Sequence, residues 1–434
     1  MRKRLKIGRN SLCPCGSGRK FKRCHLNQAI DMQQISTKRE VTSDGGENYE
    51  LDKSGFHLIK TTDLAQLSGF DASASFGMDG EEPDVARIWY MSVCANSEEL
   101  RSVMDPSTAK DWLLRTRADA ILDSTRIFRV SVARSQRIQR GLLDDLYAND
   151  FSEYLEKLDS IDQLICEDVP SGFILTNIPN AQCVRTENGK IIIVSEVMRH
   201  FLYYMSLGTT ELEVPLEVRR NALLIAVRVM FMYETMDFEI DPRGEVPYDL
   251  HAEIERVVEA QIQFVIGHEY AHHRLGHSFD DVIKIHSKQG GAFIGQNPSQ
   301  LSLYKRGWEQ EFEADTASVM GAKAWEARHR LVHGAIHFFL ALYVFETVAD
   351  RLDKAFASID THPPTVERFF RIVNRFGSEF SIDRSDAEKW LEYHRRISDQ
   401  IIALAECQPE NFRRYGSIYL AQWQGKPLVD RIDY

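Results

Sequence analysis

A His-Glu-x-x-His unit, formed by His268, Glu269 and His272, constrains this chain more than any other feature. On an α-helix, residues four positions apart differ by only about 40° around the axis and lie about 6 Å apart along it. Two imidazoles at this spacing can reach one zinc ion at roughly 2.0–2.1 Å. Glu269 is then placed to hold the water that the metal activates.

The residues before this unit predict that it lies late in a long amphipathic helix. Apolar residues recur there at three- and four-residue intervals, and no proline occurs from Tyr248 to His277. In a regular helix, His273 and His277 are each rotated from His272 by about 100° or more. We therefore interpret both as bystanders rather than ligands of the same ion.

A catalytic zinc needs a third protein ligand, and residues 309–317 offer one. Glu311 and Asp315 are spaced i, i+4 and share a helix face, whereas Glu313 points elsewhere. We assign Glu311 as the third ligand and Asp315 as the acceptor that orients a zinc-bound histidine through its other ring nitrogen. Taken alone, this segment would be interpreted as an exposed acidic helix start. Together with the His-Glu-x-x-His unit, the same segment is better interpreted as the source of the third zinc ligand.

The His-Glu-x-x-His unit followed by Glu-Phe-Glu-Ala-Asp at residues 311–315 resembles the signature of the gluzincin peptidases that include HtpX and the CAAX prenyl proteases. Residues 180–195 are similar to that family's strand pair, and residues 361–368 resemble its His-Pro-Pro-Thr-x-x-x-Arg element. The resemblance covers roughly residues 172–376. The resemblance implies an α+β fold: a mostly helical zincin-type metallopeptidase domain with a small β-sheet.

The resemblance also implies a role for His362, which either stabilises the oxyanion or occupies the open zinc position at rest. The structural alternative is a capping or core histidine beside a helix-starting Pro-Pro pair. Arg368 matches the same element, although an arginine on a helix is usually structural. In the expected mechanism of peptide hydrolysis, zinc lowers the pKa of its bound water toward about 7, and Glu269 takes the proton and delivers it to the leaving amine. Zinc and His362 stabilise the negative charge of the oxyanion.

A turn at Glu187-Asn188-Gly189 predicts a β-hairpin, because Asn-Gly between β-rich runs is a strong hairpin signal. The strand from Lys190 to Ser195 would then lie beside the cleft and accept an extended peptide by edge pairing. Its apolar run is equally consistent with a buried strand.

The amino terminus carries a second ligand set, Cys13, Cys15, Cys24 and His25. Three cysteines and a histidine complete a tetrahedral structural zinc site, and the glycines between them permit tight turns. The stretch resembles the SEC-C motif, named for the SecA carboxyl terminus. We therefore expect two zinc ions, one catalytic and one structural.

Residues 1–25 contain nine lysines and arginines and no acid, whereas the whole chain has a net charge of −11. A basic knuckle on an acidic body suggests a docking module. The SEC-C resemblance implies a ribosome, a chaperone or another acidic partner. For charge alone, a solvated basic tail is the simpler interpretation.

Composition indicates an intracellular multi-domain protein of 434 residues, 43% of them hydrophobic. Three of seven cysteines lie in the knuckle and the others are scattered singly, which is no disulfide framework. No apolar run follows the basic start, so we expect no signal peptide and a cytoplasmic location. HtpX and the CAAX proteases span membranes several times. Here only Leu331–Val348 approaches membrane character, and its His333, His337 and Glu346 favour a buried core helix.

The predicted organisation has five parts. Residues 1–28 form the zinc knuckle, 29–50 a flexible linker, 51–170 a mainly helical domain of unknown role, 171–380 the zincin metallopeptidase domain, and 381–434 a carboxyl-terminal helix and tail packing on it. The predicted function is a soluble zinc endopeptidase acting on a protein substrate. The alternative is a catalytically silent adaptor that docks to a ribosome, chaperone or nucleic acid through the knuckle. The presence of Glu269 favours the enzyme.

Overall fold

The computed structural model describes residues 85–277, 307–353, 362–423 and 425. The knuckle of residues 1–28, the linker of residues 29–50 and the start of the 51–170 unit therefore lie outside the described residues. The chain divides into two compact units after Ile59, and every described residue belongs to the second, Lys60–Tyr434.

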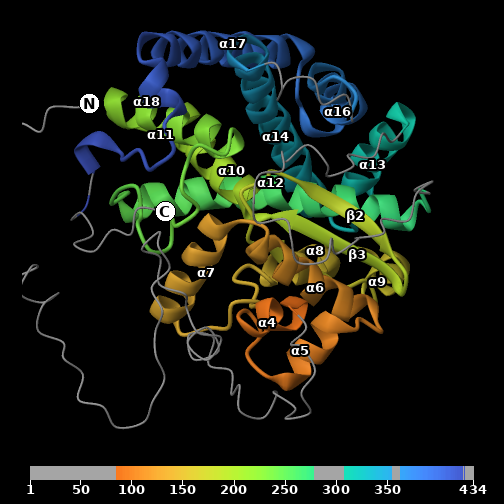
Figure 1. Ribbon diagram of the computed structural model, residues 1–434. Coiled ribbons are helices and arrows are strands. Elements are labelled where there is room, and N and C mark those ends of the chain that lie inside the picture. Colours follow the sequence, from red (N-terminus) through yellow and green to blue (C-terminus); the bar gives the residue numbers. More distant parts are fainter. Residues whose placement is uncertain (1–84, 278–306, 354–361, 424, 426–434) are drawn as a thin grey trace, which may run out of the picture. The chain divides into compact units, whose positions relative to one another are not determined.

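This part of the chain is mostly helical with one small sheet, as the sequence predicts (Figure 1). The helices are α4 (Val85–Met91), α5 (Ser97–Met104), α6 (Ala109–Leu122), α7 (Thr125–Ile138), α8 (Asn149–Lys157), α9 (Ser160–Cys166), α10 (Glu196–Thr209), α11 (Leu216–Met230), α12 (Tyr248–Arg274), α13 (Trp308–Met320), α14 (Trp325–Leu352), α16 (Thr365–Phe380), α17 (Arg384–Cys407) and α18 (Pro409–Arg413), with a 3-10 turn η2 (Ala421–Trp423). The strands are β1 (Ser171–Ile174), β2 (Ala181–Thr186) and β3 (Gly189–Ser195).

The strands form one sheet in the order β1-β3-β2. The predicted hairpin is confirmed: β2 and β3 pair antiparallel, with Thr186 opposite Gly189. Gly189 has a φ of 132°, which glycine adopts without the clash that a Cβ would cause. On its other side β3 pairs in parallel with β1. The prediction that Lys190–Ser195 is an edge strand is therefore wrong, and the two edges of the sheet belong to β1 and β2.

Strand β3 is the central strand of the sheet, and its side chains are buried on both faces. Ile192 and Val194 belong to the main hydrophobic core, whereas Ile191 and Ile193 pack with Leu113 of α6 on the opposite face. A strand covered on both faces has a continuous apolar run rather than an alternating pattern. The buried-strand alternative is therefore the one that the structure contains.

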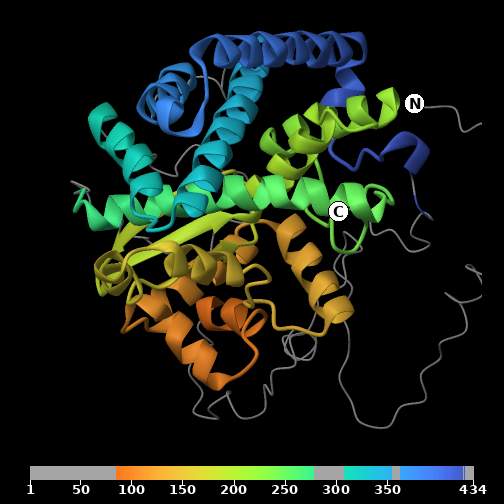
Figure 2. The same cartoon turned by 180° about the vertical axis from the view of Figure 1, so that it is seen from behind.

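Helix α12 passes through the middle of the fold in both views (Figures 1 and 2). It contacts β2, α8 and α9, and also α10, α13 and α14. In its first half only Ile254 and Val258 are buried, whereas every residue from Gln261 to His272 is buried. The predicted long helix is confirmed, and its His-Glu-x-x-His unit lies in the part that other elements surround.

Helix α14 includes the predicted core helix Leu331–Val348. It is the one helix among the described residues that is long and apolar enough to cross a membrane, and about two thirds of its most apolar 18-residue stretch is buried within the fold. Its apolar side chains join a core that extends from Tyr90 of α4 to Leu420 near the end of the described chain. Packing within the protein thus accounts for its apolar character.

Candidate metal centre

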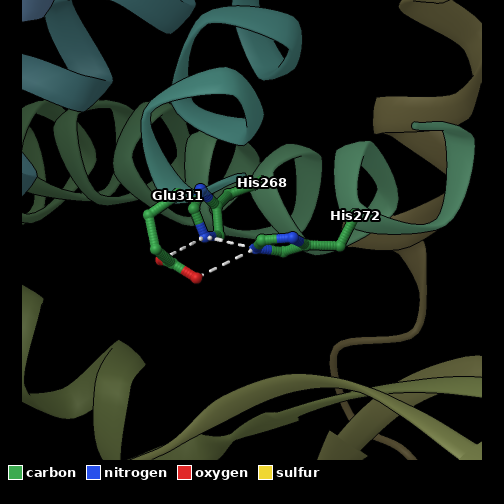
Figure 3. Close-up of side chains that lie close together, drawn as sticks. All are labelled: His268, His272 and Glu311. Atoms are coloured by element: carbon green, nitrogen blue, oxygen red, sulfur yellow. Dashed lines mark hydrogen bonds and ion pairs between the residues drawn. The ribbon is translucent and has the colours of Figure 1, made fainter. Parts of the chain in front are cut away.

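Helices α12 and α13 bring the three predicted zinc ligands of the histidine unit together (Figure 3). The Nε2 atoms of His268 and His272 lie 3.0 Å apart. The carboxylate of Glu311 places Oε2 at 3.3 Å from His268 Nε2 and Oε1 at 3.4 Å from His272 Nε2. All three side chains are buried, so these donors face one another rather than solvent.

The donor atoms fit a zinc ion in type and in spacing. Bonds of about 2.0–2.1 Å in a tetrahedral arrangement separate neighbouring ligand atoms by roughly 3.4 Å. The observed separations of 3.0, 3.3 and 3.4 Å lie close to this value. Two imidazoles and one carboxylate form a donor set known from catalytic zinc sites, which leave a fourth position for water or substrate.

A glycine allows α13 to approach α12 closely enough to place Glu311 there. A Cβ on Gly267, the residue before His268, would lie 2.5 Å from both Ser318 Oγ and Tyr154 Cε2. Ser318 Oγ donates a hydrogen bond of 3.0 Å to the carbonyl oxygen of Phe264, and Tyr154 Oη donates one of 3.1 Å to the carbonyl oxygen of Ser318. These contacts fix how α13 lies on α12.

A buried ion pair between Asp315 and Arg368 lies next to the imidazole of His268. Asp315 Oδ1 lies 2.9 Å from His268 Nδ1, the ring nitrogen that faces away from Glu311. Arg368 of α16 donates from Nε and Nη2 to the two oxygens of Asp315, at 2.8 and 2.7 Å. The structure thus brings Asp315 to the position expected of an orienting acceptor, and it adds Arg368 as the residue that holds Asp315.

These contacts shift the ionisation of the site. Burial alone would lower the pKa of His268, but hydrogen bonds and charge from Asp315 and Glu311 raise it to about 9. Burial alone would raise the pKa of Glu311, but His268, His362 and Arg368 hold it well below its usual range. Because a metal ligand must offer an unprotonated nitrogen, metal binding here would be accompanied by proton release.

Glu269 faces the edge of the sheet. Its Oε2 accepts a 2.7 Å hydrogen bond from the backbone N–H of Cys183 in β2. The carbonyl oxygen of Asn180, next to β2, accepts from the N–H of Ser195 at 2.8 Å and so faces β3. Because peptide groups alternate in direction along an antiparallel strand, the backbone N–H of Cys183 points away from β3 and toward α12. The predicted general base therefore lies against the outer edge of β2.

His362 lies just before α16 and reaches the same carboxylate from the solvent side. Its Nε2 is 3.5 Å from Glu311 Oε2, and 46% of its side chain is exposed. Exposure leaves room for this imidazole to meet a substrate. The structure therefore places His362 beside the predicted ligands, although it is separated from them by many residues in the chain.

The two histidines predicted to be bystanders differ. His273 turns away from the site and lies 3.1 Å, through Nε2, from the carbonyl oxygen of Ile165. His277 is buried, and its Nδ1 lies 2.8 Å from Nδ1 of His272. Neither histidine belongs to the group His268, His272 and Glu311. His277 nevertheless contacts one of its members, because α12 ends at Arg274 instead of continuing as the regular helix that the prediction assumes. The glycine before His277 was the signal that could have located this turn.

A second group of possible metal ligands among the described residues, Glu196, His200 and Glu239, has a different character. Arg134 donates to both oxygens of Glu196, at 2.7 and 3.2 Å. A guanidinium in this position already neutralises the carboxylate and would repel a cation. We interpret this group as a buried ion-pair cluster.

Comparison with known proteins adds evidence at the amino terminus. The SEC-C motif family matches residues 9–27, which include Cys13, Cys15, Cys24 and His25. The protein translocase subunit SecA of two strains of Chloroflexus aurantiacus is 59% identical over 29 residues, which are 7% of this chain and 3% of SecA. No solved structure matches the chain. The predicted SEC-C resemblance is confirmed, and these residues lie outside the described part of the structure.

Proposed function

We propose that this chain is a zinc-dependent endopeptidase of the HtpX and CAAX prenyl protease type that acts in the cytoplasm and uses its SEC-C motif for docking. One observation carries the proposal. Two imidazole nitrogens and a carboxylate lie 3.0–3.4 Å apart in a buried site, and Glu269 follows the first of these histidines on the same helix. A purely structural cluster of polar residues would need neither a zinc-type donor set nor the neighbouring carboxylate of Glu269 as a base.

The residues divide the chemistry among them. Zinc held by His268, His272 and Glu311 would supply Lewis acidity toward water and the scissile carbonyl. Glu269 would take a proton from the attacking water and pass it to the leaving amine. His362 would donate a hydrogen bond to the oxygen on which negative charge develops.

The edge of β2 supports an extended peptide as the substrate. Ala181 and Arg185 share the outward orientation of Cys183, because alternate peptide groups of β2 face away from β3. Backbone hydrogen bonds at such an edge bind a peptide largely independently of its sequence and leave specificity to side-chain pockets. The proposal therefore moves the predicted peptide-binding strand from β3 to β2.

The adaptor function remains the second candidate, and the SEC-C match favours it. Nine lysines and arginines in residues 1–25 add positive charge to the sequence of that motif, which suits an acidic partner such as a ribosome or a chaperone. In this alternative the metal site is structural and no peptide bond is broken. A test must therefore separate cleavage from binding.

The decisive experiment compares wild type with Glu269→Gln, using denatured casein as a probe and cellular proteins as natural candidates. The variant should retain its zinc and fold, because the ligands are untouched, and should lose at least about 10²-fold in cleavage rate. Glu253→Gln is the matched control, since Glu253 lies on α12 but its side chain is 49% exposed and pairs with Arg256. It should cleave like wild type.

Two outcomes would contradict the proposal. Equal cleavage by wild type and Glu269→Gln would exclude the general-base role. If wild type cleaves nothing while both proteins retain the same cellular partners, the adaptor function is supported instead. Proteins cleaved by wild type and retained by Glu269→Gln would identify the substrate.

A further inference from the structure

A turn after α12 brings His277 back onto the metal site. Gly276 has a φ of 64°, in the left-handed region that favours glycine. Its N–H donates to the carbonyl oxygen of His273, and the N–H of His277 donates to that of His272, both at 3.1 Å. This is a helix-ending turn of the Schellman type. It reverses the chain and places Nδ1 of His277 2.8 Å from Nδ1 of His272.

The hydrogen positions along this contact follow from the needs of a metal ligand. Nε2 of His272 faces His268 and Glu311, so it must keep its lone pair to bind an ion. The proton of His272 then lies on Nδ1 and is donated to Nδ1 of His277. His277 in turn carries its proton on Nε2, which lies 3.2 Å from Oε2 of Glu313. The contacts from His272 through His277 to Glu313 form a relay of hydrogen bonds, and the carboxylate of Glu313 is its final acceptor.

The other histidine ligand is supported in a similar way. Nδ1 of His268 lies 2.9 Å from Oδ1 of Asp315, which Arg368 holds in place. Each ligand imidazole is thus backed by a carboxylate, directly for His268 and through a second imidazole for His272. Such contacts fix the tautomer and the ring orientation of metal-bound histidines.

We propose that His277 is a positioning residue that holds His272 in its metal-binding tautomer and orientation, with Glu313 setting the tautomer of His277. This inference rests on the proposed function, because it presumes that His272 binds zinc. Glu313 lies on α13 two residues after Glu311, so the relay also ties the end of α12 to the helix that carries the third ligand. The side chain of Glu313 is 63% exposed, so we expect its own contribution to be the smaller one.

The test measures zinc affinity by chelator competition in the full chain, with Cys13→Ser present throughout so that the histidine site alone is titrated. His277→Ala should weaken zinc binding by about 10–100-fold. His277→Asn should retain most of the affinity, because an Asn side-chain oxygen can take the place of the accepting Nδ1. The control is His273→Ala, at the same helix end but facing Ile165, and it should bind zinc normally.

The outcomes are distinguishable. Normal affinity in His277→Ala would overturn the inference and leave the proposed function standing, and so would equal losses in the Ala and Asn variants. A parent protein that binds no zinc at this site would overturn both. Should His277→Ala fail to fold, Glu313→Ala replaces it. We expect that variant to lose about two- to fivefold in zinc affinity, and no loss would overturn the inference.

Discussion

Asp315 is a buried carboxylate between the guanidinium of Arg368 and the imidazole of His268. Burial would raise its pKa, but the charge and hydrogen bonds of Arg368, with those of His268, hold it below its usual range. The guanidinium of Arg368 is itself buried and meets both carboxylate oxygens. Such a pair is costly to break, because the remaining charge cannot recover its hydration.

Arg368→Leu should therefore destabilise the protein by about 3–5 kcal/mol, measured by urea unfolding. Arg371→Leu is the matched control, one turn away on α16. The side chain of Arg371 is 44% exposed, and its ion pairs with Glu309 and Glu367 are open to solvent, so a loss within about 1 kcal/mol is expected. Equal losses in the two variants would show that the Asp315 pair is not the source of stability.

At His362 a catalytic role can be distinguished from a structural one by a single substitution. Its position beside Glu311 and its exposure suit a hydrogen-bond donor to the oxyanion. His362→Ala should lower turnover by about 10²–10³ while zinc content stays unchanged. Steady-state kinetics and metal analysis test this together. A rise in basal activity would indicate a resting ligand of the metal instead, and unchanged turnover would make the residue structural.

At the scale of elements, the crossing of α12 and α14 depends on Gly334. A Cβ on this residue would clash with the carbonyl oxygen of Ala260 and lie 2.5 Å from its carbonyl carbon. Both atoms belong to the backbone of α12, so no side-chain rotation can relieve the contact. The close crossing helps to hold the helix that carries both predicted histidine ligands.

Gly334→Ala should accordingly destabilise the protein by about 1–3 kcal/mol or more, because the two helices must move apart. Thermal or urea unfolding would measure the loss. Gly307→Ala is a suitable control, since its nearest neighbour, Gln310 Oε1, would lie 4.0 Å from the added Cβ. If the two variants are equally stable, the helix crossing is more adaptable than its geometry indicates.

The sequence predicts the elements of the site well because their signals are local. Three- and four-residue periodicity identifies α12, and i, i+4 spacing places Glu311 and Asp315 on one face of α13. Asn188-Gly189 identifies the hairpin. Each of these patterns depends on neighbours within one or two turns of chain, so no knowledge of distant contacts is required.

The features that the sequence leaves unpredicted are contacts that local patterns do not encode. An apolar run identifies β3 as a strand, but its central place depends on parallel pairing with β1, more than ten residues earlier in the chain. His277 is excluded by helical geometry only if the helix continues, and Gly276 ends that regularity. Arg368 looks structural in isolation because its partner Asp315 lies on another helix.

At the scale of the whole molecule, the chain combines two ligand sets of different chemistry. In the predicted assignment, Cys13, Cys15, Cys24 and His25, within the SEC-C match, would supply thiolates and an imidazole for a closed tetrahedral site. His268, His272 and Glu311 would supply nitrogen and oxygen donors, and a catalytic zinc held by three such ligands keeps a fourth position open. A closed thiolate site exchanges its metal slowly, whereas an open site of nitrogen and oxygen donors gives a chelator access.

Purified wild type should therefore contain two zinc ions per chain, of which a chelator removes the one at the histidine site first. His268→Ala and Cys13→Ser should each retain one ion by metal analysis, and the remaining ion should resist the chelator only in His268→Ala. His251→Ala provides the control, because His251 is an exposed histidine on α12 that contacts Tyr203 rather than the site. A wild type with a single zinc, lost in only one of the two variants, would show that one of the ligand sets holds no metal.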